Sequence, residues 1–166
     1  MLKEKQKEKN IVGETKDSHL FSSLLSITPS ISYGRFRVGT NVSDYNDCIE
    51  KTYSGDNHYT LDEYVVRLYG YVITLCCRES GFIETICFDE HCLYNGKDLI
   101  GMNILDFMRM MNKEPDSVDI DWVPTKDENH GQNQRCYCFY FNRSHVIQLW
   151  TWRKRIVNLT VYDYRL

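Results

Sequence analysis

The stretch from Cys136 to Tyr164, CYCFYFNRSHVIQLWTWRKRIVNLTVYDY, constrains the fold more than any other part of the chain. It predicts three consecutive β-strands, over residues 136–141, 145–153 and 156–164, because β-branched and aromatic residues alternate there with a period of two. The connections at residues 142–144 and 154–155 are tight, and tight connections force antiparallel pairing. A sheet so rich in aromatic residues and so poor in catalytic groups favours a protein that binds over one that catalyses.

The middle strand predicts which side chains share a face of this sheet. Trp150 and Trp152 are two residues apart, so both point to the same side of their strand. Residues 103–112 predict the clearest helix, with Asn103 as its N-cap and Pro115 as its end. Its apolar face would consist of Ile104, Leu105, Phe107, Met108 and Met111. We expect this helix to cover the two tryptophans and to make them part of the core.

Other segments complete a coarse architecture. Residues 71–78 and 82–88 predict a hairpin, Asn95-Gly96 predicts a tight turn, and residues 117–123 predict a short strand. The fold class predicted from these elements is α+β, a mostly antiparallel β-sheet with helices packed on one side. Residues 1–18 are expected to form a mobile charged tail, and residues 19–166 a single domain of that class.

Four segments carry weaker patterns. Residues 31–38 predict an edge strand or a bent strand with a bulge at Gly34, and residues 41–59 and 124–135 predict irregular, polar chain. Residues 61–69 give conflicting signals, because a helix-capping pattern at Thr60-Leu61-Asp62-Glu63 precedes residues that favour a strand.

Charge and hydropathy limit the classes of partner and the cellular location that we expect for this protein. The formal net charge is −3, which argues against direct binding of nucleic acid, because phosphate groups require a basic face. No apolar run approaches the roughly 20 residues that a membrane helix needs, and no signal-peptide pattern follows the charged first ten residues. We therefore expect a cytoplasmic protein that has no membrane contact.

The seven cysteines predict structural thiols. Their number is odd and no pair has the CxxC spacing of a zinc site, so we expect no metal, no cofactor and no disulfide framework. The one thiol with a possible catalytic role is Cys92, which would pair with a distant histidine as the nucleophile of a small cysteine hydrolase. No other motif suggests catalysis, and the sequence favours a protein that is not an enzyme.

An acidic run predicts the binding site. Six carboxylates lie within fifteen residues and surround one tryptophan, and their spacing does not match a calcium loop. We expect them to form an acidic docking surface for a cationic partner, with the tryptophan as its anchor. The residues of this predicted site are Glu114, Asp116, Asp119, Asp121, Trp122, Asp127 and Glu128. A competing interpretation uses Trp150 and Trp152 with the basic residues 153–155 to stack single-stranded nucleic acid.

The second half of the chain resembles immunity proteins of bacterial contact-dependent growth-inhibition systems. The resemblance rests on FIETICFDEHCLYNGKDLIGMNILDFMRMMNKEPD and on QLWTWRKRIVNLTVYDY: a strand, an Asn-Gly turn, a helix that opens after Gly-Met, an acidic segment and an aromatic hairpin. It implies a cytoplasmic protein that binds and neutralises one cognate toxin domain, often a nuclease. Nucleases tend to be basic, which suits the acidic run. The resemblance therefore implies that the toxin binds either through that run or by pairing a strand with an exposed sheet edge.

Overall fold

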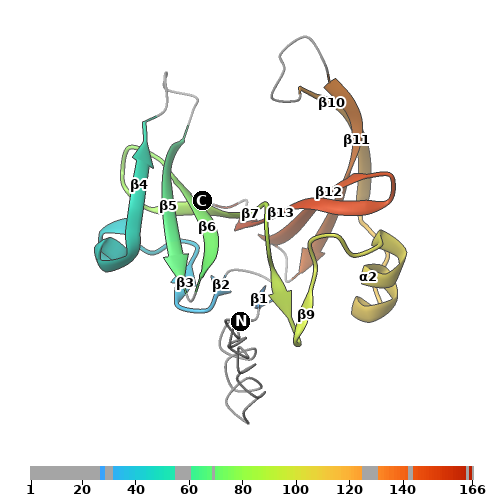
Figure 1. The fold of residues 1–166 in the computed structure, drawn as a ribbon, viewed down its shortest axis with the longest axis horizontal. Helices are drawn as coiled ribbons and strands as arrows, with labels where there is room; N and C mark the ends of the chain where they lie inside the picture. Colours follow the sequence, from blue (N-terminus) through green and yellow to red (C-terminus); the bar gives the residue numbers. More distant parts are fainter. Residues whose placement is uncertain are drawn as a thin grey trace, which may run out of the picture.

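An eight-stranded antiparallel sheet dominates the computed structural model, which describes residues 27–28, 32–54, 61–68, 70–124, 131–141, 144–163 and 165 (Figure 1). The strand order is β10-β11-β12-β13-β7-β6-β5-β4. The strands are β4 (Ile49–Tyr53), β5 (Asp62–Leu68), β6 (Tyr71–Cys77), β7 (Ile83–Phe88), β10 (Ser117–Pro124), β11 (Gly131–Phe141), β12 (His145–Trp152) and β13 (Arg155–Asp163). The predicted antiparallel sheet is confirmed, whereas the predicted tail at residues 1–18 lies outside the described residues.

The sheet consists of two meanders that meet in its middle. Strands β4 to β7 pair in sequence order, strands β10 to β13 do the same, and β13 pairs with β7 from Leu159–Phe88 to Tyr162–Thr85. The smaller elements lie before the first meander and between the two meanders. They are β1 (Ile27–Thr28), β2 (Ser32–Tyr33), β3 (Phe36–Arg37), the 3-10 helix η1 (Val42–Cys48), β8 (Leu93–Tyr94), β9 (Lys97–Asp98) and the helix α2 (Ile104–Met111).

The main core lies on one side of this sheet, which we call the covered face. Its centre consists of alternate residues of neighbouring strands, including Phe139, Ile147 and Phe88, all of them buried. Phe107 of α2 meets Phe139 edge-on at a ring-centroid distance of 5.1 Å, and Tyr33 of β2 meets Phe88 in the same way at 4.7 Å. Helix α2 and the small sheet of β1 to β3 are thus held against the large sheet by aromatic contacts.

The tryptophans lie on the opposite side, which we call the reverse face, so the prediction that α2 covers them is wrong. Trp150 is half-buried over a small cluster of Cys136, Cys138 and Val146, and 39% of Trp152 is exposed. Both faces of β12 are apolar, so its period of two does not show which face is buried. The larger cluster of buried aliphatic and aromatic side chains is on the side of Ile147, and helix α2 packs on that side.

The ends of the predicted elements follow local backbone chemistry. Asn103 caps α2 by accepting the N–H of Leu105 (2.9 Å), as predicted. The helix ends earlier than Pro115, because Asn112 adopts a left-handed conformation with φ of 48°. Leu105, predicted on the apolar face, is 50% exposed. The Asn95-Gly96 turn is confirmed, with positive φ at both residues.

In the segments with weak sequence patterns, pairing with other strands determines the secondary structure. Ser32–Arg37 form the hairpin of β2 and β3, and Gly34 (φ 55°) is part of its turn and not a bulge. Residues 62–68 are strand β5, which pairs with β4 and β6, because hydrogen bonds along both edges outweigh a local helix signal. Residues predicted as irregular also join the sheet, namely 49–53 in β4 and 131–135 in β11.

Asp163 at the end of β13 predicts a loss of stability in acid. Its carboxylate accepts hydrogen bonds from Arg165, foremost among the causes that lower its pKa to about 2, and it lies 3.5 Å from His145 Nε2. A pKa below that of the unfolded chain stabilises the fold above pH 4, and this contribution disappears as the pH falls towards 2. We expect a loss of about 1–2 kcal/mol in urea titrations over that interval, since exposed Arg165 is partly screened by solvent. The variant Asp163→Asn should lack this part of the pH dependence.

Candidate functional site

Strand β10 is an edge strand with large apolar side chains exposed along one of its faces. It pairs with β11 without a break, from Ser117–Cys138 to Pro124–Gly131, and no other strand pairs with it in the part of the chain that the structure describes. Figure 1 shows this end of the sheet rising away from α2. The exposed fractions are 45% for Val118, 63% for Ile120 and 56% for Trp122. This apolar face of β10 is exposed because the core ends under β11 and does not reach β10.

The other face of β10 is acidic. Asp119 and Asp121 are exposed, and their partners on β11 are Cys136 and Gln134. Cys136 in turn pairs with Trp150, so the two carboxylates extend the reverse face of the sheet. Trp122 lies on the opposite side of β10. The structure therefore brings three of the predicted site residues together on one strand but divides them between its two faces.

Trp122 lies directly on the backbone of β11. A Cβ atom on Gly131 would be only 2.1 Å from the indole atoms Cε2 and Cζ2, so this position accommodates the ring only because it is glycine. The indole is thus fixed against the neighbouring strand while more than half of its surface faces solvent. A fixed, exposed aromatic ring loses little conformational entropy when a partner covers it.

The remaining predicted carboxylates have other positions. Asp116 accepts the backbone N–H of Tyr140 (2.7 Å) and the ammonium of Lys113 (3.0 Å), and these bonds, that of Tyr140 first, lower its pKa. Asp116 thus fastens the start of β10 to β11 and is not free for a partner. Glu114 is exposed and lies beside α2, while Asp127 and Glu128 lie outside the described residues.

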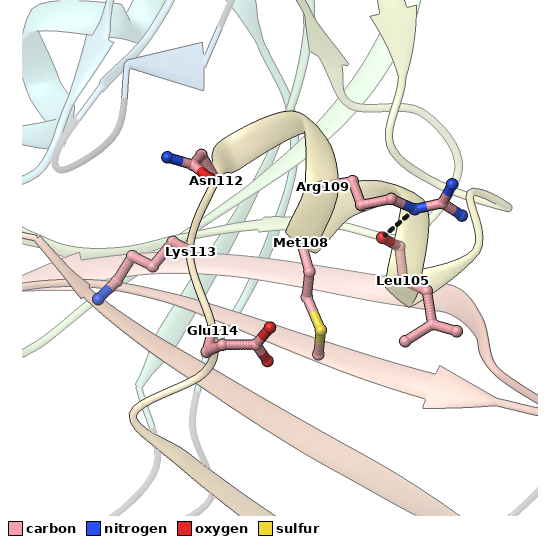
Figure 2. Close-up of a pocket in the computed structure, with 6 residues that line it drawn as sticks. All are labelled: Leu105, Met108, Arg109, Asn112, Lys113 and Glu114. Carbon is pink, nitrogen blue, oxygen red and sulfur yellow. Dashed lines mark hydrogen bonds between the residues drawn. The ribbon is translucent and has the colours of Figure 1, made fainter.

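A shallow hollow of about 480 Å³ lies at the end of α2 (Figure 2). Leu105 and Met108 project from one side of the helix, and Glu114 lies across from Met108. Arg109 donates to Leu105 O (3.2 Å) and to Asp106 (2.6 Å), and Lys113 pairs with Asp116. Since both cations already have partners, the hollow offers no strong site for an anion.

Sequence reasoning missed Val118 and Ile120, although the chain carried the signal. Residues 118–122 read Val-Asp-Ile-Asp-Trp, which alternates apolar and acidic residues with the period of a strand. Considered only as acids, the carboxylates formed a patch. Once residues 118–122 are read as a strand, Asp119 and Asp121 lie on one face, and the other face is apolar.

Cys92 does not have the environment of a nucleophile. It is completely buried, and burial raises the pKa of its thiol well above the usual value. Neighbouring His91 pairs with Asp98 (2.6 Å), whose carboxylate also accepts the backbone N–H of Cys92 (3.0 Å). All seven cysteines are free thiols, and within the described ranges no cluster of three or more His, Cys, Asp or Glu side chains is suited to hold a metal ion.

The nucleic-acid interpretation depends on Trp152 and the basic turn after it. Arg153 and Lys154 form that turn with φ of 50° and 65°, one residue earlier than predicted. The guanidinium of Arg153 lies over the Trp152 ring, 4.3 Å from its centroid. It therefore covers ring surface on which a base would stack.

Comparison with known proteins gives no relative: no family model, no curated protein and no solved structure matches the chain. Among the helices that the structure describes, none has the length and apolar character needed to cross a membrane.

Proposed function

We propose that the protein is an immunity protein, which binds a cationic toxin domain in the bacterial cytoplasm and neutralises it through β10. The observation that carries this proposal is the exposed apolar face of an edge strand, Val118, Ile120 and Trp122, with Asp119 and Asp121 on its other side. The resemblance of the second half of the chain to immunity proteins of contact-dependent growth inhibition supports the same function.

The physical argument for binding is the cost of leaving this strand uncovered. Exposed edge strands with apolar side chains promote unwanted association, and natural proteins usually protect them. A partner that covers β10 removes that cost and gains the burial of Trp122, a residue type that often dominates binding energy. The two carboxylates add attraction for a basic domain and repel an acidic one.

The alternative functions have less support. A cysteine hydrolase based on Cys92 needs a reactive thiol, and this thiol is buried and has a raised pKa. Binding of single-stranded nucleic acid needs free aromatic surface, and Arg153 covers part of Trp152 while Trp150 is half-buried.

The test of the proposed function uses the protein encoded immediately upstream of this chain. Its C-terminal domain is expressed in a bacterial host, alone and together with this protein. We expect growth to stop with the domain alone and to resume on co-expression, and we expect the two proteins to purify as a complex. A harmless upstream domain, or one that remains toxic on co-expression, would refute the proposal.

A charge substitution on β10 should slow the association of that complex. In the double variant Asp119→Asn/Asp121→Asn, we expect the association rate at low salt to fall about tenfold and to depend less on ionic strength, because steering by the carboxylates is lost. Stopped-flow fluorescence measures both quantities. The double variant Asp44→Asn/Glu90→Gln, which changes the net charge equally at exposed positions away from β10, is the matched control. Equal association rates for the two variants would show that the interface does not include the acidic face of β10.

A further inference from the structure

We infer that the partner binds by adding a β-strand to the edge of β10 that faces away from β11, and that this strand alternates lysine or arginine with large apolar residues. The inference rests on the proposed function and specifies the chemistry of its partner. It follows from three observations: the regularity of this edge, the division of its side chains between two faces, and the charge that would oppose a second copy of the chain.

The two edges of the large sheet differ in a way that singles out β10. Strand β4 shows the usual protection of an edge: its register with β5 is irregular between Ile49 and Lys51, and the exposed side chains of Glu50 and Lys51 lie at this irregularity. Strand β10 has eight consecutive pairs with β11, no irregularity and no lysine, and its one proline, Pro124, is its last residue. Its outer backbone groups therefore form a regular template for another strand.

The side chains of β10 determine which strand fits. Neighbouring residues of an added strand point alternately to the two faces, as those of β10 do. Residues beside Asp119 and Asp121 would lie on the reverse face, where cations find opposite charge. Residues beside Ile120 and Trp122 would lie on the other face, where apolar side chains bury the exposed surface. Cross-strand pairs of both kinds stabilise a sheet.

A second copy of this chain does not fit the same edge. Two β10 strands related by a two-fold axis perpendicular to the sheet would pair residues of the same face. In the registers that pair the most residues of β10, either Asp119 lies opposite Asp121 or Asp121 lies opposite itself. Like charges directly opposite each other destabilise a pair of strands. The acidic face thus selects a cationic strand and disfavours self-association.

The test uses synthetic eight-residue peptides with blocked ends. The probe alternates lysine and valine, and NMR of the 15N-labelled protein follows chemical shifts and hydrogen exchange of the β10 and β4 amides. We expect saturable binding with slower exchange of alternate β10 amides and no change at β4. A peptide with glutamate in place of lysine should not bind, and Asp119→Asn/Asp121→Asn should weaken binding of the lysine peptide.

Two methylated peptides separate strand addition from contact through side chains alone. One carries N-methyl groups on its two central lysines and the other on its two central valines. Only one of these two sets of amides can face β10, so strand addition predicts that one peptide loses about tenfold in affinity while the other does not. Equal affinities of the two peptides, protection of β4, or no saturable binding at millimolar peptide would overturn the inference. A dimer in sedimentation, with β10 protected in the absence of peptide, would overturn it in favour of a second copy.

These results are distinguishable from failure of the proposed function. If the upstream domain is neutralised but the peptides do not behave as described, the immunity function stands and strand addition is refuted. If the upstream domain is not neutralised but the peptides bind as described, the preference of β10 for a cationic strand stands and the immunity function is refuted.

Discussion

Replacing Phe107 by alanine is expected to lower the free energy of unfolding by about 3–5 kcal/mol. Phe107 is fully buried, and its ring meets that of Phe139 at 5.1 Å, so the substitution leaves a cavity between α2 and the sheet. Because domains of this size are stable by roughly 5–15 kcal/mol, this change removes a large part of the total. Urea denaturation followed by far-ultraviolet circular dichroism measures it.

Leu105→Ala on the same helix is the matched control for this experiment. Leu105 is 50% exposed, and its loss should cost less than about 1 kcal/mol. Trp150→Ala should also cost less than Phe107→Ala, because Trp150 is half-buried on the reverse face. If Trp150→Ala proved the more damaging change, the main core would lie on the reverse face and the position of α2 would be wrong.

Replacing Trp122 by alanine should weaken binding of the toxin domain that we propose as the partner by at least about 2 kcal/mol, which is roughly a thirtyfold increase in Kd. The stability of the free protein should change little, since 56% of Trp122 is exposed and its ring lies against Gly131 at the end of the β10–β11 pair. Isothermal titration calorimetry gives the affinity, and thermal unfolding gives the stability. A variant that binds as well as the natural protein would remove Trp122 from the interface.

Gly131→Ala tests the position of the ring without altering Trp122. The new Cβ would lie 2.1 Å from the indole atoms, so the ring must move off β11, and binding should weaken in the same direction as in Trp122→Ala. Gln132→Ala, one residue further along β11 and on its other face, is the control and should bind normally. Normal binding by Gly131→Ala would show that the position of the ring is unimportant.

Local patterns predicted the strands better than they predicted the packing. The three C-terminal strands, the hairpin of β6 and β7 and the cap at Asn103 follow from alternation, turn residues and capping chemistry, all of which act within a few residues. The buried face of β12 could not be predicted in this way, because it depends on which side of a doubly apolar strand receives a helix. Strand β5 was ambiguous for a similar reason: its conformation is fixed by partners on both sides.

The candidate site was predicted in part. Asp119, Asp121 and Trp122 do lie exposed on one strand, as the acidic run suggested. The role of Asp116 could not be foreseen, because its partner, the N–H of Tyr140, is 24 residues away in the sequence. The position of β10 at the edge of the sheet could not be predicted either, since the strand order of a sheet depends on the whole chain.

The junction between the two meanders has a consequence for synthesis on the ribosome. Strand β13 is the last strand of the sheet to be made, yet it lies in the middle, between β12 and β7. Until it emerges, the edge of β7 has no partner from the second meander, and the apolar residues Ile86 and Phe88 lie at that unfinished edge. The nascent first half is thus open to wrong pairing over the time needed to translate some seventy residues, about 4–14 s at roughly 5–20 residues per second.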